Sequence, residues 1–146
     1  SIYIILLLLF IFPCLTSCKK IITTDKDSAD KYIETLYKYQ IGQKKNGIMI
    51  DLRDIDIYAE GHIKGFISYD YLKDPDGFIH YMEGMYSKAK VVFLLSDESD
   101  LILEVSKVLQ ENGYKKIYIY LDGYDSLISL SSDYFFIETG LDNCGC

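Results

Sequence analysis

The sequence predicts an α/β domain with a central, mostly parallel five-stranded sheet flanked by helices. Short apolar runs of strand length alternate with longer segments in which apolar residues recur at helical spacing, and this alternation is typical of parallel sheets. The chain has 146 residues, of which 49% are hydrophobic and only two are proline. This length and composition indicate one compact domain and argue against disorder or low complexity.

The first half of the domain contains three predicted strands and two predicted helices. The strands are the β-prone stretch 21–24, the buried run 48–52 and a strand that starts at Ile67. The first helix covers 28–40, where apolar side chains recur at helical spacing, and Ser28 is its expected N-cap. The second is the short helix 54–60, which Gly61 closes.

The second half continues the same alternation after a turn at 74–77. Helices are predicted over 78–86, about 100–112 and 124–130, and strands over 91–95 and 117–120. The run 91–95 is five consecutive apolar residues, which suits a fully buried strand. The helix that follows it has an apolar side and ends at Gly113.

The N-terminal 17 residues differ from the rest, because 13 of them are apolar and none is charged. The run Ile2 to Phe12 has the length of a secretory signal and is short for a transmembrane helix, which needs about 20 residues. The following Leu15-Thr16-Ser17-Cys18 resembles the lipobox of bacterial lipoproteins. That resemblance implies a signal peptide over 1–17 and a diacylated Cys18 at the mature N-terminus.

We therefore expect a tether at 18–21, a domain over 22–140 and a tail at 141–146. The lipid would anchor the protein to a membrane of the bacterial cell envelope, facing the periplasm or the exterior. The alternative is an apolar anchor that is retained, although Lys19 and Lys20 then lie on the side that the positive-inside rule disfavours. Both interpretations make the membrane a partner.

Charge and cysteine content exclude two classes of protein. A formal net charge of -7 makes nucleic acid a poor partner, because the average surface repels phosphate. Of the four cysteines, Cys14 would leave with the signal and Cys18 would carry lipid, so only Cys144 and Cys146 remain as thiols. Two cysteines cannot make a multi-disulfide scaffold.

Two segments resemble the rhodanese signature, in which a strand ending Asp-x-Arg precedes a Glu-x-Gly-His-Ile-x-Gly element. The matching residues are Asp51, Arg53, Gly61, His62 and Gly65. Phe66 stands where the family usually has Ala, and the run 91–95 together with Asp122-Gly123-Tyr124 resembles the family's second half. The resemblance implies the rhodanese fold. We expect Asp51 and Arg53 to form an ion pair, and His62 to satisfy a backbone group of the core.

Catalytic rhodaneses carry a cysteine directly after the central strand, in a loop that wraps backbone amides around the sulfur. Sulfur transfer needs a thiolate in a positive environment. In this chain the position falls on Ser96, and the loop Ser96, Asp97, Glu98, Ser99 and Asp100 contains no cysteine, lysine or arginine. At an effective dielectric near 20, one charge about 4 Å away contributes roughly 4 kcal/mol before screening, so repulsion of an anionic donor should dominate.

The carboxylates of this loop have a structural interpretation instead. Acidic residues at a helix start favour its dipole, and we expect Asp97 or Ser99 to cap the helix that follows. Ser96 is a weak candidate nucleophile, because neither His62 nor His80 is placed by the sequence as its base.

The leading hypothesis is a lipid-anchored rhodanese-like domain without catalytic activity, which binds or scaffolds an unidentified protein or peptide. Cys144 and Cys146 form a terminal Cys-Gly-Cys whose favoured interpretation is a tail without function. Two alternatives stay open. The first is an envelope sulfurtransferase, or a thiol redox or sulfur-carrier protein, that uses Cys144 and Cys146. The second is a soft-metal site completed by His62, His80 or another molecule. We expect neither a cofactor nor a resident metal.

Overall fold

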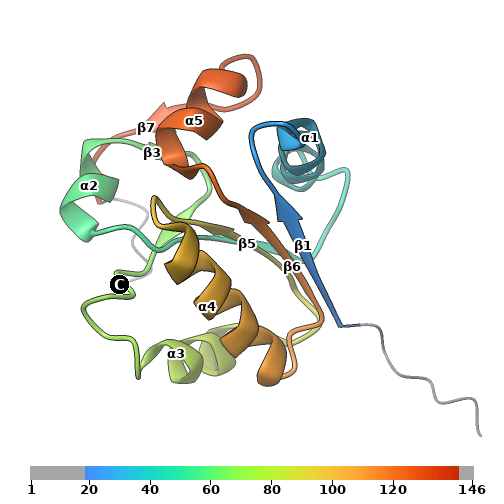
Figure 1. Ribbon diagram of the computed structural model, residues 1–146, viewed down its shortest axis with the longest axis vertical. Coiled ribbons are helices and arrows are strands. Elements are labelled where there is room, and N and C mark those ends of the chain that lie inside the picture. The colour runs from blue at the N-terminus through green and yellow to red at the C-terminus, as the bar shows by residue number, and fades with distance from the viewer. Residues whose placement is uncertain (1–18, 142–146) are drawn as a thin grey trace, which may run out of the picture.

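The computed structural model describes residues 19–141 and contains the predicted five-stranded sheet (Figure 1). Its strands are β1 (Lys20–Thr24), β2 (Gly47–Asp51), β4 (Ile67–Ser68), β5 (Val91–Leu95) and β6 (Lys116–Tyr120). They are all parallel and lie in the order β1-β6-β5-β2-β4. The predicted fold class is therefore confirmed, and every main strand points its carboxyl end to the same edge of the sheet.

Five helices flank this sheet. They are α1 (Ala29–Gln40), α2 (Ile55–Glu60), α3 (Phe78–Met85), α4 (Ser99–Glu111) and α5 (Gly123–Leu130). Helices α1 and α5 pack on one face of the sheet, and α3 and α4 pack on the other (Figure 1). Both faces are therefore covered, which explains why the central strands are almost wholly apolar.

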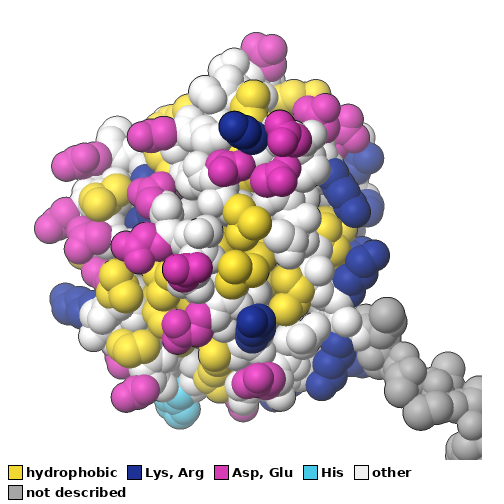
Figure 2. Space-filling view, viewed as in Figure 1, with side chains coloured by type: hydrophobic (Ala, Val, Ile, Leu, Met, Phe, Trp, Pro, Cys, Tyr) yellow, Lys and Arg dark blue, Asp and Glu magenta, His cyan; other side chains and the backbone are white. Residues whose placement is uncertain are grey.

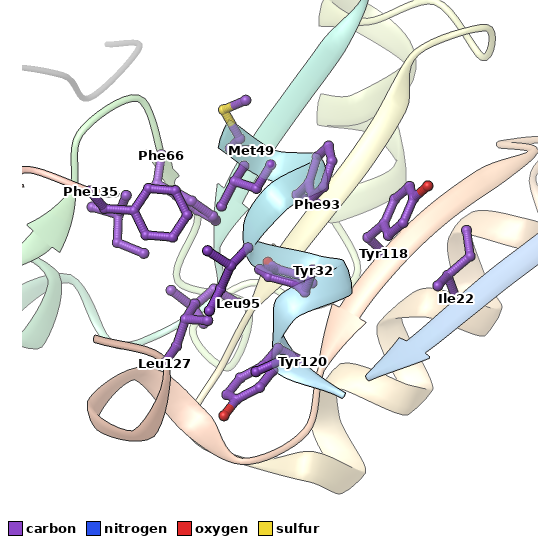
Figure 3. Packing of buried hydrophobic residues seen from close by; sticks show 14 of the residues in the cluster. Ile22, Tyr32, Met49, Phe66, Phe93, Leu95, Tyr118, Tyr120, Leu127 and Phe135 are labelled. Carbon is purple, nitrogen blue, oxygen red and sulfur yellow. The ribbon is translucent and has the colours of Figure 1, made fainter. Parts of the chain in front are cut away.

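Alternate side chains of the central strands enter two separate cores. In β5, Phe93 and Leu95 pack with α1 and α5, whereas Val92 and Leu94 pack with α3 and α4. The first core is rich in aromatic rings (Figure 3): Phe93 stacks on Tyr118 with ring centroids 4.8 Å apart. The buried Tyr32 hydroxyl donates a hydrogen bond to the Leu94 carbonyl at 2.9 Å, so its polar end is satisfied.

The structure differs from the prediction in one pair of strands. Residues His62–Ile63 form β3, which pairs antiparallel with β7 (Ile137–Glu138) near the end of the described chain. Both strands have two residues and lie far apart in the sequence, so no local pattern marks their pairing. This pairing holds the C-terminal segment against the rhodanese-like motif.

Two local predictions also need correction. The first strand begins at Lys20, inside the segment 18–21 expected to be a tether. Ser28 occupies the N-cap position of α1, but its side chain caps no helical N–H; its hydroxyl exchanges hydrogen bonds with Asp25 instead. The predicted signal peptide, Cys18, and the tail cysteines Cys144 and Cys146 lie outside the described residues.

Candidate functional site

A small cavity lies where β2 and β5 end at the carboxyl edge of the sheet. Its volume is about 120 Å³. It is lined by Leu52, Arg53, Asp54, Ile57, Leu72, Ser96, Asp97, Glu98 and Leu101. Ligands of open parallel sheets commonly bind beyond the carboxyl ends of the strands, which makes this cavity the candidate site.

An ion pair joins Arg53, which lines the cavity, to Asp51 at the end of β2. The Arg53 guanidinium donates from Nη2 to Asp51 Oδ2 at 2.7 Å and from Nε to Asp51 Oδ1 at 3.0 Å. The backbone N–H of Arg53 donates to Asp51 Oδ1 as well, and Nη2 also donates to the Gly61 carbonyl at 2.9 Å. Both side chains are nearly inaccessible to solvent. The ion pair ties the end of β2 to the start of β3.

The ring of Tyr124 covers the outer side of Arg53. The guanidinium carbon lies 3.7 Å from the ring centroid, a cation–π distance. Burial alone would lower the pKa of Arg53, but the hydrogen bond and charge of Asp51, with help from Asp97, raise that pKa above its usual value. Arg53 therefore stays charged, and its guanidinium is engaged by the fold.

The loop after β5 uses its polar side chains for its own structure. Ser96 is 3% exposed, and its hydroxyl accepts a hydrogen bond from the Glu98 backbone N–H at 3.1 Å. Asp97 Oδ1 accepts from the backbone N–H of Tyr124 at 2.9 Å, at the start of α5. The expected capping of α4 by Asp97 or Ser99 is therefore wrong: Glu98 is the N-cap of α4, and no side chain caps it there.

Three carboxylates surround the cavity. Asp97 and Glu98 come from the loop after β5, and Asp54 comes from the start of α2, where its Oδ1 accepts from the Asp56 N–H at 2.8 Å. The single cation among the lining residues is Arg53, whose charge Asp51 balances. The lining also includes Ile57 and Leu72, which are 44% and 67% exposed. The cavity thus combines carboxylates with exposed apolar side chains.

The other predicted motif residues hold the surrounding backbone. His62 is buried, with Nδ1 2.9 Å from the Tyr58 carbonyl oxygen, and its ring stacks on Tyr58 at a centroid distance of 3.7 Å. Its Nε2 lies 3.9 Å from Glu138 of β7. Gly65 has φ +93°, a conformation that favours glycine. Neither residue lines the cavity, and His80 does not line it either.

The structure therefore brings Arg53, Ser96, Asp97 and Glu98 together, while Ser99 and Asp100 begin α4 outside the cavity lining. Sequence reasoning missed the lining residues that come from other segments, namely Asp54, Ile57 and Leu72. It missed the role of Tyr124 too. Asp54 could have been found, because it directly follows the Asp-x-Arg motif, but the others come together only through tertiary packing.

Residues 19–141 provide neither a metal-binding cluster nor a membrane-spanning helix. That range holds no group of three or more His, Cys, Asp or Glu arranged to bind a metal ion. None of its helices is both long and apolar enough to cross a bilayer. The sequence has no cysteine between residues 19 and 143, so no thiol lines the cavity among the residues that the structure describes.

Comparisons with known proteins agree with this architecture. The model of the rhodanese-like domain family matches residues 34–129. No curated protein matches the chain. A crystal structure of the Alr3790 protein from Anabaena sp. is similar with a TM-score of 0.61 and 13% identity, covering 73% of this chain and 79% of that chain.

Two further solved structures share the fold. The BH2092 protein from Bacillus halodurans has a TM-score of 0.59 and 19% identity, over 82% of this chain and 78% of its own. An uncharacterized protein from Saccharomyces cerevisiae has a TM-score of 0.58 and 18% identity, over 78% of this chain and 96% of its own. Because the family model covers most of the parallel sheet together with the loops that build the cavity, the chain belongs to the rhodanese-like domain family.

Proposed function

We propose that this chain is a lipid-anchored, non-catalytic rhodanese-like module of the bacterial cell envelope, and that its acidic cavity binds a basic side chain of a protein or peptide. The observation that carries the proposal is the lining of the cavity: its described residues supply three carboxylates, a serine and no thiol, and the only arginine of the sequence is paired to Asp51.

Sulfur transfer needs groups that this site lacks. The sulfur-accepting nucleophile must be a thiolate, and an anionic donor requires a positive field. Ser96 supplies a hydroxyl that already accepts a hydrogen bond from Glu98 N–H. Asp54, Asp97 and Glu98 make the field negative, and Arg53 is balanced by Asp51. These features support a binding role over a catalytic one.

A lysine or arginine side chain suits the cavity in size and polarity. About 120 Å³ is well below the roughly 300 Å³ at which cavities for small-molecule ligands begin, but it can admit the end of one side chain. The aliphatic stem would lie along Ile57 and Leu72, and the cation would meet the carboxylates. Glu98 is the best residue to substitute. Asp54 and Asp97 also accept hydrogen bonds from backbone N–H groups at the starts of α2 and α5, so their replacement would disturb the fold as well.

Activity is tested with thiosulfate and cyanide. We expect no turnover from the chain that carries Cys144→Ser and Cys146→Ser, and no persulfide by mass spectrometry. Turnover that survives the double substitution would contradict the proposal, because the cavity itself would then be catalytic.

Binding is tested by calorimetric titration with an oligolysine peptide and, as the charge control, an oligoglutamate peptide. We expect oligolysine to bind, more weakly at high salt, and Glu98→Gln to reduce the affinity for oligolysine without weakening any binding of oligoglutamate. The matched control is Glu111→Gln, which removes the same charge from an exposed side chain at the other end of α4. Equal losses for the two variants would show that net charge, not the cavity, attracts the peptide.

The anchor is tested by mass spectrometry of the chain expressed in bacteria. We expect an N-terminal peptide that begins at Cys18 with its acyl groups, and Cys18→Ser should prevent both cleavage and acylation. An unmodified N-terminus in the unsubstituted chain would disprove lipidation.

A second candidate function is a thiol redox or sulfur carrier that uses Cys144 and Cys146. It is supported by the position of the last described residues: the Gly140 N–H donates to the Ala59 carbonyl of α2 at 2.8 Å. The neighbouring Ile57 of α2 lines the cavity. Cys144 lies four positions after Gly140, a reach of about 14 Å when extended. Persulfide on either cysteine after thiosulfate treatment would support this function, and its absence under conditions that label a sulfurtransferase control would exclude it.

A further inference from the structure

The amino edge of the sheet carries a concentration of lysines. Eight of the 14 lysines lie in or just before the first residues of four strands. They are Lys19, Lys20, Lys44, Lys45, Lys88, Lys90, Lys115 and Lys116, which we call the basic edge. We infer that the basic edge rests on a bilayer containing anionic phospholipid. This inference rests on the proposed lipid anchor and specifies how the domain is oriented on it.

The strand register brings these lysines into one row. Lys20 of β1 pairs with Lys116 of β6, Lys116 pairs with Val91 of β5, and Val91 pairs with Gly47 of β2. The four strands therefore begin at the same level, and their preceding loops lie side by side. Neighbouring strands are about 4.8 Å apart, so the row is roughly 14 Å wide. The parallel fold, rather than any one segment, assembles the charge.

Acidic residues are absent from the loops of this edge. Residues 41–46, 86–90 and 112–115 contain no Asp or Glu. Two carboxylates lie next to these loops in the sequence or in space: Glu111 ends α4, and Glu83 of α3 lies 3.6 Å from Lys88. Seven of the eight lysines are exposed, and Lys90 is partly exposed. The edge therefore carries a positive potential although the whole chain has a net charge of -7.

The opposite edge has the reverse charge. The loops that follow β1, β2, β5 and β6 contain exposed carboxylates, among them Asp27, Asp54, Glu98 and Asp122. Figure 2 shows this separation: Lys and Arg side chains gather along the right-hand side of the view, and Asp and Glu side chains gather on the left and at the top. One end of the sheet therefore attracts anions, and the other repels them.

The position of Cys18 selects a membrane as the partner of the basic edge. Only Lys19 separates Cys18 from Lys20, where β1 starts, so the two α-carbons are at most about 7 Å apart. A lipid on Cys18 would hold the basic edge within about one Debye length of the headgroups, which is roughly 8 Å at physiological ionic strength. Juxtamembrane lysines are attracted to anionic headgroups. The acidic cavity, at the far end of the strands, would face away from the membrane.

The test is lysine labelling of the full lipidated chain on vesicles. The chain is bound to phosphatidylcholine vesicles with or without phosphatidylglycerol, treated with an amine-reactive reagent, and analysed peptide by peptide. With phosphatidylglycerol we expect Lys90, Lys115 and Lys116 to react at least about fivefold more slowly than in its absence. Lys26 and Lys73, exposed in loops at the carboxyl edge, are the internal controls and should not change.

A matched pair of variants separates local charge from net charge. Lys44→Gln, Lys45→Gln and Lys115→Gln together should abolish most of the protection of Lys90 and Lys116. Lys26→Gln, Lys31→Gln and Lys73→Gln together remove the same charge elsewhere and should leave that protection intact. The inference would be overturned if phosphatidylglycerol slowed the labelling of Lys90, Lys115 and Lys116 no more than that of Lys26 and Lys73. It would also be overturned if the two triple variants changed the protection equally.

The outcome for the anchor is read in the same spectra. If Cys18 is acylated but the basic edge is unprotected, the orientation is wrong and the anchor stands. If Cys18 is unmodified and the basic edge is still protected, the anchor is wrong and the lipid-binding edge stands. If Cys18 is unmodified and the chain does not sediment with phosphatidylglycerol vesicles, both are wrong.

Discussion

The carboxylate of Asp97 accepts a hydrogen bond from the backbone N–H of Tyr124 at 2.9 Å. This contact joins the loop after β5 to the start of α5, which follows β6. Gly123, with φ +83°, allows the close approach, since a β-carbon there would lie 3.2 Å from Asp97 Oδ1. The loop that would host sulfur chemistry in a catalytic relative is thus fastened to a neighbouring helix through an acidic side chain.

Asp97→Ala should lower the free energy of unfolding by about 1 kcal/mol, because the first turn of α5 loses an acceptor. Asp97→Asn keeps an oxygen acceptor and should cost less. The measurement is urea denaturation of both variants. Equal losses for the two variants would mean that the charge of Asp97, through Arg53, matters more than the hydrogen bond.

Arg53→Met should be strongly destabilising, by roughly 3 to 5 kcal/mol, because the buried Asp51 carboxylate loses its partner. The double variant Asp51→Asn, Arg53→Met should be less destabilised than the sum of the two single variants, since neither charge is left unpaired. The measurement is a double-mutant cycle: urea denaturation of the unsubstituted protein, Asp51→Asn, Arg53→Met and the double variant. Additive losses would contradict the ion pair's role in holding β2 to β3.

Ser96→Cys provides a probe of the field in the cavity. In a background where the other cysteines are serine, we expect the pKa of the introduced thiol to fall by roughly 0.5 to 1 when Glu98→Gln is added, since a nearby carboxylate opposes thiolate formation. Thiolate absorbance against pH gives the values. Glu111→Gln, at the other end of α4, is the control and should leave this pKa unchanged. An equal response to both would show that Glu98 exerts no local effect.

Alkaline pH should unfold the protein cooperatively. Burial, followed by the charge of Asp74, raises the pKa of Tyr69 to about 12, and burial raises the pKa of Tyr32 far above its ordinary value. These tyrosines bind their protons more tightly in the folded than in the unfolded chain, so stability is complete below about pH 10 and is lost as pH rises through the folded pKa values.

Urea denaturation between about pH 9 and pH 12, with tyrosinate absorbance as a second probe, measures this loss. Tyr69→Phe should flatten the pH dependence in that interval, because one of the contributing groups is removed. A free energy of unfolding that does not change over the interval would contradict the prediction.

The sequence predicted the parallel sheet well because its signals are local. The apolar run 91–95 coincides with β5, and the helix predicted over 28–40 is found as Ala29–Gln40. Each segment carries its own periodicity, and burial on both faces of the sheet makes the central strands recognisable from composition alone.

The site was predictable only in part, because its remaining features depend on contacts between distant segments. The Asp51–Arg53 pair is separated by one residue, and the expected ion pair is present. Asp97 accepts a hydrogen bond from the Tyr124 N–H of α5, 27 residues away in the sequence. The sequence instead suggested that Asp97 caps α4, because its loop directly precedes that helix. The β3–β7 pairing and the positions of Ile57 and Leu72 likewise arise only when the chain is folded.

Arg53 is the only arginine, and its planar guanidinium already contacts the Asp51 carboxylate, the Gly61 carbonyl and the Tyr124 ring. Every other cation of the chain is a lysine, a mobile point charge with no fixed geometry of donors. Contacts made through these side chains depend on charge density and ionic strength more than on the shape of the partner. At the proposed basic edge, attraction to an anionic surface should therefore depend on how much charge that surface concentrates, and should weaken as salt rises.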